Sequence, residues 1–179
     1  MREADQALFP LVNVGRVVQL FRQQLCGKEQ PDLVLLSIVA GAVEHSLTAS
    51  RATSPKLQKD SGSDDEYEVE ETADVCNLKL EPAISYVQVS ALYQKYIAVI
   101  KGYCDLSLFP DAGEFATKDL IKRVSDILWN TLSKDKIKDR THISNIFSYV
   151  TESKLDCFGV AFGVVAGCQV LGFNDVHLG

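Results

Sequence analysis

Cys157 is the residue whose position in this chain most suggests catalysis. It falls in the first turn of a predicted buried helix, where backbone N–H groups and the helix dipole favour the thiolate form of cysteine. A cysteine nucleophile also requires a histidine base and a residue that orients the base. The three histidines, His45, His142 and His177, are not placed to complete such a triad. We therefore expect a small residue at a tight helix start, and no catalytic residue.

Ser61 and Ser63 offer a second kind of chemistry, because each has an acidic residue three positions further on, Asp64 and Glu66. Kinases that read acidic motifs act on this pattern, so both serines are hypothetical phosphorylation sites. The alternative is a solvated acidic loop without modification, and the run of charge favours that interpretation.

The cysteines indicate a reducing compartment rather than a metal site. They are five, an odd number, and no two form a Cys-x-x-Cys pair: Cys26, Cys76, Cys104, Cys157 and Cys168. Neither a zinc cluster nor a disulfide framework is indicated. The first residues do not resemble a signal peptide. The sequence thus predicts an intracellular protein with reduced thiols and with neither a metal nor another cofactor.

The net charge of −6, from 18 basic and 24 acidic residues, is concentrated in one segment. Residues 54–74 hold two lysines and eight acidic residues, so the rest of the chain is neutral. Few apolar residues lie there, which predicts an exposed acidic loop or β-hairpin insertion over about 51–83. Val75, Cys76, Leu78 and Leu80 would form a marginal strand on its far side. The acidic balance argues against bulk binding to nucleic acid or to an anionic membrane.

Apolar spacing predicts six helices and one incipient strand. The helices cover roughly 14–25, 31–43, 89–100, 117–132, 141–150 and 157–171, and alternation over 173–178 suggests the strand. Asn13, Thr117, Thr141 and Asp156 are the expected helix caps, and Pro31 is expected in the first turn of the second helix. Gly172 is expected to end the last helix.

The last helix has a stripe of glycines, Gly159, Gly163 and Gly167. Each interior glycine destabilises a helix by roughly 1 kcal/mol relative to alanine. The stripe therefore predicts that another backbone packs closely against it. A membrane span is the alternative, but the uncharged run of 17 residues from Cys157 to Phe173 is short of the ~20 that a span needs.

Several blocks of sequence together resemble the menin family. They run in order over nearly the whole chain except about 51–83: Leu8-Phe9-Pro10-Leu11, Pro31-Asp32-Leu33-Val34-Leu35-Leu36-Ser37, Val43-Glu44-His45, Asp105-Leu106-Ser107-Leu108, Val124-Ser125-Asp126-Ile127-Leu128-Trp129-Asn130, Lys154-Leu155-Asp156, Gly159-Val160-Ala161-Phe162, Cys168-Gln169 and Asp175-Val176-His177-Leu178. Long blocks in a shared order are far more specific than a short motif.

The resemblance implies a mainly α (α+β) fold in two parts. Residues 1–104 would form a helical N-terminal domain that carries the acidic hairpin or loop. Residues 105–179 would form the first part of a transglutaminase-like domain without activity, ending inside its core. Cys157 would then occupy the nucleophile position of transglutaminase-like folds, with its catalytic partners absent.

The resemblance also implies a function, which is that of a nuclear scaffold and transcription regulator rather than an enzyme. Such scaffolds bind short peptides of MLL-type histone methyltransferases and of the transcription factor JunD, and together with MLL they bind the chromatin reader LEDGF. Asp156, Cys157 and Phe158 would lie at the peptide-binding pocket. Serines are common at the last two positions in the family, whereas Phe158 is bulkier and apolar.

Two other interpretations remain open at this stage. A cysteine-dependent enzyme of the transglutaminase kind predicts that Cys157 alkylates much faster than the other thiols. A stand-alone helical adaptor predicts a cooperative melt of the 179-residue chain.

Overall fold

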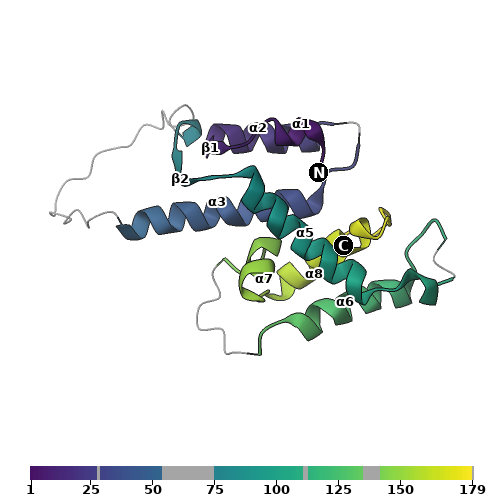
Figure 1. Cartoon of the computed structure of the whole chain (residues 1–179). Coiled ribbons are helices and arrows are strands. Elements are labelled where there is room, and N and C mark those ends of the chain that lie inside the picture. Colours follow the sequence, from purple (N-terminus) through teal and green to yellow (C-terminus); the bar gives the residue numbers. More distant parts are fainter. Residues whose placement is uncertain (28, 54–74, 111–112, 135–141, 179) are drawn as a thin grey trace, which may run out of the picture.

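A computed structural model of the chain is mainly helical and has one small sheet (Figure 1). It describes residues 1–27, 29–53, 75–110, 113–134 and 142–178. The elements are α1 (Glu3–Gln6), β1 (Leu11–Asn13), α2 (Val14–Leu25), α3 (Leu33–Thr53), β2 (Lys79–Ile84), α5 (Tyr86–Tyr103), the 3₁₀ helix η1 (Leu106–Leu108), α6 (Lys118–Thr131), α7 (Ile146–Glu152) and α8 (Cys157–Val170).

Three of the four predicted helix caps are confirmed. The Asn13 side chain accepts a hydrogen bond from the Arg16 backbone N–H at 3.0 Å and begins α2. Thr117 begins α6, and Asp156 begins α8. Such caps are readable from sequence because the side chain bonds an N–H only two or three residues away.

The fourth predicted cap was Thr141, but α7 begins after a different residue. Asn145 caps this helix by accepting a 2.9 Å bond from the Ser148 N–H, whereas Thr141 lies outside the described residues. Similarly, α3 begins at Leu33, two residues after Pro31, and the Asp32 carboxylate accepts the Leu35 N–H at 3.0 Å. In both cases a side-chain acceptor closer to the apolar run sets the helix start.

The strand expected over 173–178 is wrong, because these residues belong to no helix or strand in the structure. The stop at Gly172 is confirmed. This glycine has a φ of +99°, a conformation that L side chains rarely adopt. The Phe173 N–H then donates to the Cys168 carbonyl at 2.9 Å and turns the chain back along α8.

The expected acidic hairpin is not confirmed. β2 includes Leu80 of the predicted strand, but it pairs antiparallel with β1, near the start of the chain, with Leu11 opposite Ile84. Residues 75–77 form a helical turn rather than a strand, and 54–74 lie outside the described residues. A three-residue strand such as β1 is too short to show alternation, so its pairing is invisible in the sequence.

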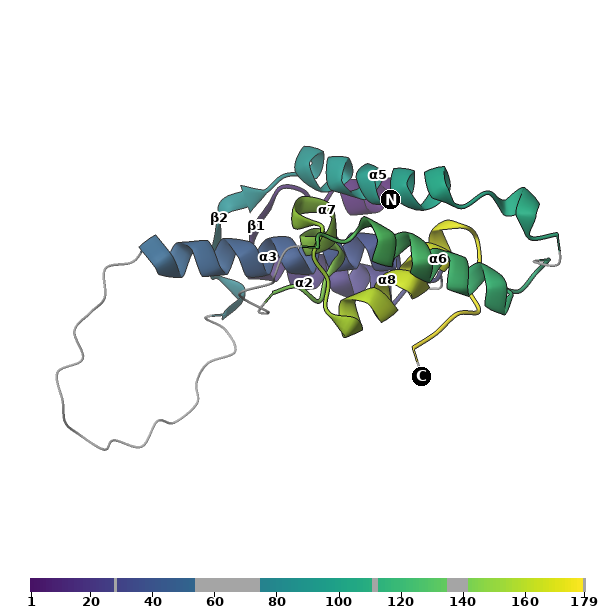
Figure 2. The same cartoon turned by 90° about the horizontal axis from the view of Figure 1, so that it is seen from below.

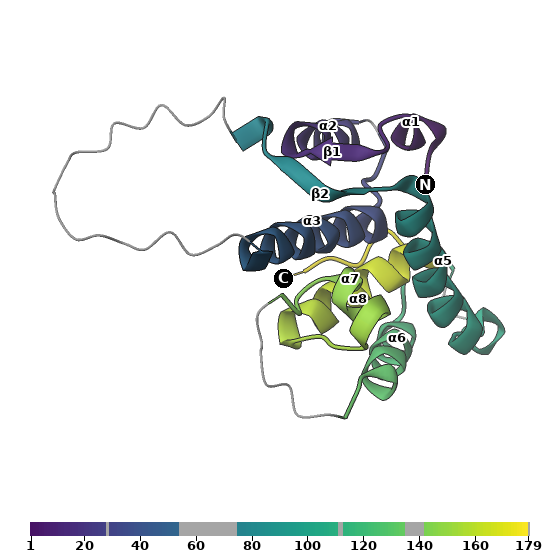
Figure 3. The ribbon, with the colours of Figure 1, turned by 60° about the vertical axis from the view of Figure 1, so that its left-hand side comes forward.

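α3 is the central helix, as its nearly continuous apolar sequence predicts. It contacts β2, α5, α7 and α8, and Figure 3 shows the β1–β2 ribbon between α2 and α3. Seen from below in Figure 2, α6 and α8 lie side by side beneath α5. One hydrophobic core therefore draws on helices from both predicted parts of the chain. The domain boundary near residue 104 stays a prediction.

The glycine stripe of α8 faces neighbouring elements, and the atoms that it meets belong mostly to their side chains rather than to their backbone. A Cβ at Gly159 would lie 3.1 Å from the Ile143 carbonyl oxygen, so the predicted close backbone is confirmed there. At Gly167 it would lie 2.7 Å from Cγ1 of Val124 on α6. At Gly163 the atom nearest to such a Cβ also belongs to a side chain of α6. The stripe thus lets α6 side chains sit against the α8 backbone.

Buried aromatic residues tie α5 to this part of the core. The Tyr96 side chain is completely buried, and its hydroxyl donates to the Gly163 carbonyl at 2.6 Å. Burial raises the pKa of Tyr96 well above its usual value, so the group stays a donor. Its ring packs edge-on against Tyr149, with 5.9 Å between the ring centroids.

In the part of the chain that the structure describes, no single helix is both long and apolar enough to cross a membrane. Among the described residues no one helix passes that test, and α7 with α8 passes it only as a pair bent by 97°.

Candidate functional site

The predicted peptide-binding residues lie together at the start of α8. Asp156 accepts the Gly159 N–H at 2.6 Å, and its own N–H donates to the Ile143 carbonyl at 3.0 Å. These two bonds hold the first turn of α8 against the segment that precedes α7. Cys157 and Phe158 follow in that turn, and both side chains are exposed. The arrangement presents a thiol and an apolar ring on a rigid helix end.

Two of the three histidines are turned to partners other than the Cys157 thiol. Nδ1 of His142 is bonded to the Glu44 carboxylate of α3, and His45 packs against the ring of Phe147 with 5.8 Å between centroids. Among the described residues no hydrogen bond joins the Cys157 thiol to either imidazole. Neither of these two histidines is therefore placed as the base that nucleophilic cysteine chemistry needs.

The five thiols fall into two environments. Cys26, Cys76 and Cys157 are exposed, whereas Cys104 and Cys168 are buried. Burial raises the pKa of the Cys104 thiol, and burial followed by the charge of Asp175 raises that of Cys168 to about 11. Both buried thiols therefore stay neutral near pH 7 and act as small core residues.

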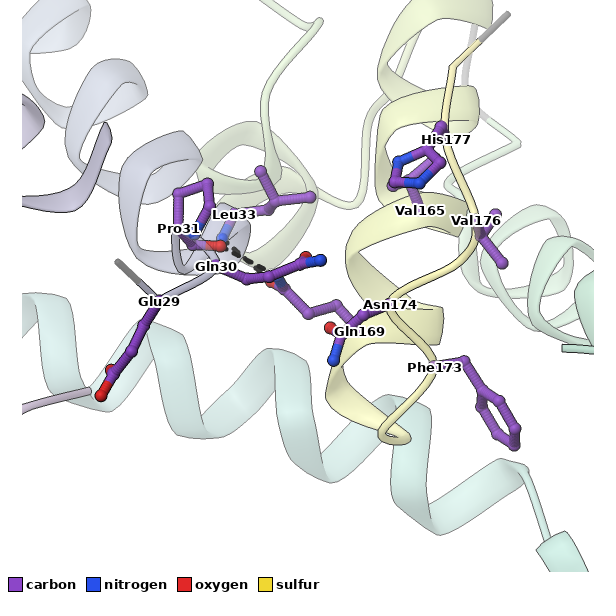
Figure 4. Close-up of a pocket in the computed structure, with 10 residues that line it drawn as sticks. All are labelled: Glu29, Gln30, Pro31, Leu33, Val165, Gln169, Phe173, Asn174, Val176 and His177. Carbon is purple, nitrogen blue, oxygen red and sulfur yellow. Dashed lines mark hydrogen bonds between the residues drawn. The ribbon is translucent and has the colours of Figure 1, made fainter. Parts of the chain in front are cut away.

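A pocket at the other end of α8 is bounded by the segment before α3 (Figure 4). Its volume is about 430 Å³, and its walls mix apolar side chains such as Val165 and Val176 with polar ones. Gln169 crosses its floor: its Nε2 donates to the Pro31 carbonyl at 2.8 Å, and its Oε1 accepts the Leu33 N–H at 3.1 Å. Both ends of that amide are thus used in joining α8 to α3.

His177 lies on the wall of this pocket, beside Val165, and is exposed to solvent. No three His, Cys, Asp or Glu side chains of the described residues gather in a way that could hold a metal ion. The predicted phosphorylation sites Ser61 and Ser63 lie outside the described residues. The start of α8 therefore remains the place where predicted site residues come together.

A family model described as Menin matches residues 2–179 of the chain. The chain belongs to the menin family. A crystal structure of menin that reveals the binding site for Mixed Lineage Leukemia (MLL) protein is also similar, at 38% sequence identity and a TM-score of 0.69. That match covers 95% of this chain and 31% of the menin chain. The mainly helical fold with one small sheet matches the menin fold.

Sequence reasoning missed two features of this menin-family chain that fix the site. The Glu44 carboxylate is hydrogen-bonded to His142 and also accepts a bond from Nδ2 of Asn145 at 3.1 Å, which ties α3 to the segment that precedes α7. Gln169 joins the other end of α8 to α3. The sequence offered one signal of the Gln169 contact, because Gln169 is the only strongly polar residue in the uncharged run of α8.

Proposed function

We propose that this menin-family chain serves as a scaffold that binds a short N-terminal peptide of MLL-type histone methyltransferases. The observation that carries the proposal is the match over 95% of the chain to the menin structure with its MLL site. An identity of 38% supports a shared fold and a related surface. The chain spans 31% of that menin chain, so we expect it to supply only part of a complete pocket.

The finer parts of the proposal rest on the resemblance of the sequence blocks. We propose that the protein binds JunD, that it binds LEDGF jointly with MLL, and that it lies in the nucleus. We also propose that it regulates transcription and chromatin and acts as a tumour suppressor. Residues 105–179 are proposed to be the first part of a transglutaminase-like domain without enzymatic activity.

The proposed contact for the peptide is the first turn of α8. Phe158 leaves 57% of its surface exposed on a helix end that Asp156 holds rigid. Aromatic residues, including phenylalanine, are enriched at protein interfaces. Cys157 beside it is small enough to let a peptide approach the helix.

The test is a fluorescence-polarisation titration of the chain with a labelled MLL N-terminal peptide, with menin as the positive control. We expect saturable binding that is weaker than that of menin. Phe158→Ala should weaken binding about fivefold or more, as for an interface aromatic that contributes over ~1 kcal/mol. Trp129→Ala is the matched control, because Trp129 on α6 is also 57% exposed. Absence of saturable binding, or equal effects of both variants, would contradict the proposal.

A further inference from the structure

The turn that precedes α7 packs against the first turn of α8. It comprises residues 142–145, and we call it the 142–145 turn. The carbonyl of its buried Ile143 accepts the Asp156 N–H at 3.0 Å. A Cβ at Gly159 would lie only 3.1 Å from that carbonyl oxygen and 3.1 Å from Cα of Ser144. The backbone of the turn therefore contacts the helix end that carries the proposed peptide contact.

Glu44 of α3 holds both ends of the 142–145 turn. One of its carboxylate oxygens is hydrogen-bonded to Nδ1 of His142, and the other accepts a bond from Nδ2 of Asn145 at 3.1 Å. Asn145 also lies close to the backbone of α3, because a Cβ at Gly41 would be 2.5 Å from its Oδ1. Gly41 and Glu44 are three residues apart and share one face of the helix. This face of α3 supports the turn, and the turn contacts α8.

The backbone of His142 indicates that the turn needs this support. Its φ of +65° lies in the left-handed region, which is unfavourable for a residue other than glycine. Such a conformation persists where surrounding contacts hold it in place. The bond between Glu44 and the imidazole is one such contact, and the burial of the neighbouring Ile143 is another. Loss of the Glu44 carboxylate should therefore let the turn relax and shift the Ile143 carbonyl that Asp156 uses.

We propose that Glu44 is a positioning residue for the peptide contact formed by Asp156, Cys157 and Phe158. Its carboxylate fixes the 142–145 turn, and the turn fixes the N–H of Asp156 and with it the direction of the first turn of α8. Glu44 acts through this turn and does not bind the peptide itself. The inference rests on the proposed peptide binding at α8, but the contacts that link Glu44 to α8 can be tested without any peptide.

The first experiment measures hydrogen exchange of the whole chain by NMR. The Gly159 N–H reports on the start of α8, because it donates to the Asp156 carboxylate at 2.6 Å. We expect Glu44→Ala to speed its exchange about threefold or more, while the amides of α2 keep their rates. An unchanged rate at Gly159 would overturn the proposal. An equal increase in α2 would mean that Glu44 only stabilises the whole fold, and would overturn it too.

A conservative variant and a matched control separate positioning from the loss of a charge. Glu44→Gln keeps one acceptor oxygen for Asn145 and gains an amide that can donate to Nδ1 of an uncharged His142. We therefore expect Glu44→Gln to retain the slow exchange at Gly159. Asp126→Ala, which removes an exposed carboxylate from α6, should also retain it. If either variant exchanges as fast as Glu44→Ala, the two hydrogen bonds are not the cause and the proposal is wrong.

A double variant tests whether Glu44 and His142 act as one unit. Because Glu44→Ala already removes the bond to the imidazole, adding His142→Ala should change the Gly159 exchange rate little further. Residues in one hydrogen-bond network are expected to be non-additive in this way. Fully additive effects of the two substitutions would show that His142 acts independently of Glu44, and would contradict the proposed link.

The second experiment is the fluorescence-polarisation titration with the labelled MLL N-terminal peptide. We expect Glu44→Ala to weaken binding about threefold or more and Glu44→Gln to leave it nearly unchanged. Unchanged affinity of Glu44→Ala, when the unaltered chain binds, would overturn the positioning role. If the unaltered chain does not bind, the proposed function fails, and the exchange rates still decide whether Glu44 fixes the start of α8. Thermal melts confirm that each variant is folded.

Discussion

Gly41 lies within α3 at the place where this helix meets the start of α7, and alanine should not fit there. A Cβ at Gly41 would lie 2.5 Å from Oδ1 and 2.8 Å from Cγ of Asn145, and would also meet Cβ of Phe147. Asn145 cannot easily move, because its side chain caps α7 and bonds Glu44. Gly41→Ala should therefore push α7 away from α3.

The expected magnitude follows from opposing contributions. In an exposed helix interior, alanine would stabilise the fold by about 1 kcal/mol relative to glycine. Overpacking in a tight contact costs about 1–3 kcal/mol, and loss of the Asn145 cap costs about 0.5–2 kcal/mol. We expect Gly41→Ala to lower the free energy of unfolding by about 1–3 kcal/mol, which for a chain of this size lowers Tm by about 2–4 °C per kcal/mol.

The assay is urea unfolding followed by circular dichroism, with Gly102→Ala as the control. Gly102 lies in the last turn of α5, is exposed, and has no atom within 4 Å of a would-be Cβ. Its replacement should be neutral or stabilise the fold by up to about 1 kcal/mol. If Gly41→Ala proves as stable as Gly102→Ala, the packing of α7 on α3 described above is refuted.

Three further predictions concern single side chains. Tyr96→Phe removes the buried bond to the Gly163 carbonyl and should lower stability by about 1 kcal/mol, whereas Tyr103→Phe, 59% exposed, should not change it; thermal melts measure both. Cys157 should alkylate at pH 7 no faster than the other exposed thiols, by mass spectrometry of iodoacetamide adducts, and a much faster rate would revive the cysteine-enzyme interpretation. Because the pKa of Cys168 is raised to about 11 from 9.0, its contribution to stability is complete below pH 9 and is lost as the pH rises towards 11. Urea midpoints across that range should fall less in Cys168→Ala.

The helix start that carries the candidate site was predictable from the sequence, but its surroundings were not. The cap at Asp156 and the positions of Cys157 and Phe158 follow from a local pattern at a helix start. The pairing of Glu44 with His142 spans 98 residues of sequence, and no local spacing indicates it. It decides that this imidazole is turned to α3 rather than to the thiol.

The amino-acid sequence by itself determined six of the helices, most of their caps and the family, because each depends on spacing within a few turns or on long blocks in order; α1 and η1 were not predicted. The tertiary structure decided what these helices meet. It paired Leu11 with Ile84, which lies 73 residues further along the chain, and it placed Gln169 against the backbone at Leu33, 136 residues away. Such contacts arise when distant apolar faces are buried together and their polar groups must find partners. That requirement belongs to the folded chain, and no local pattern in the sequence expresses it.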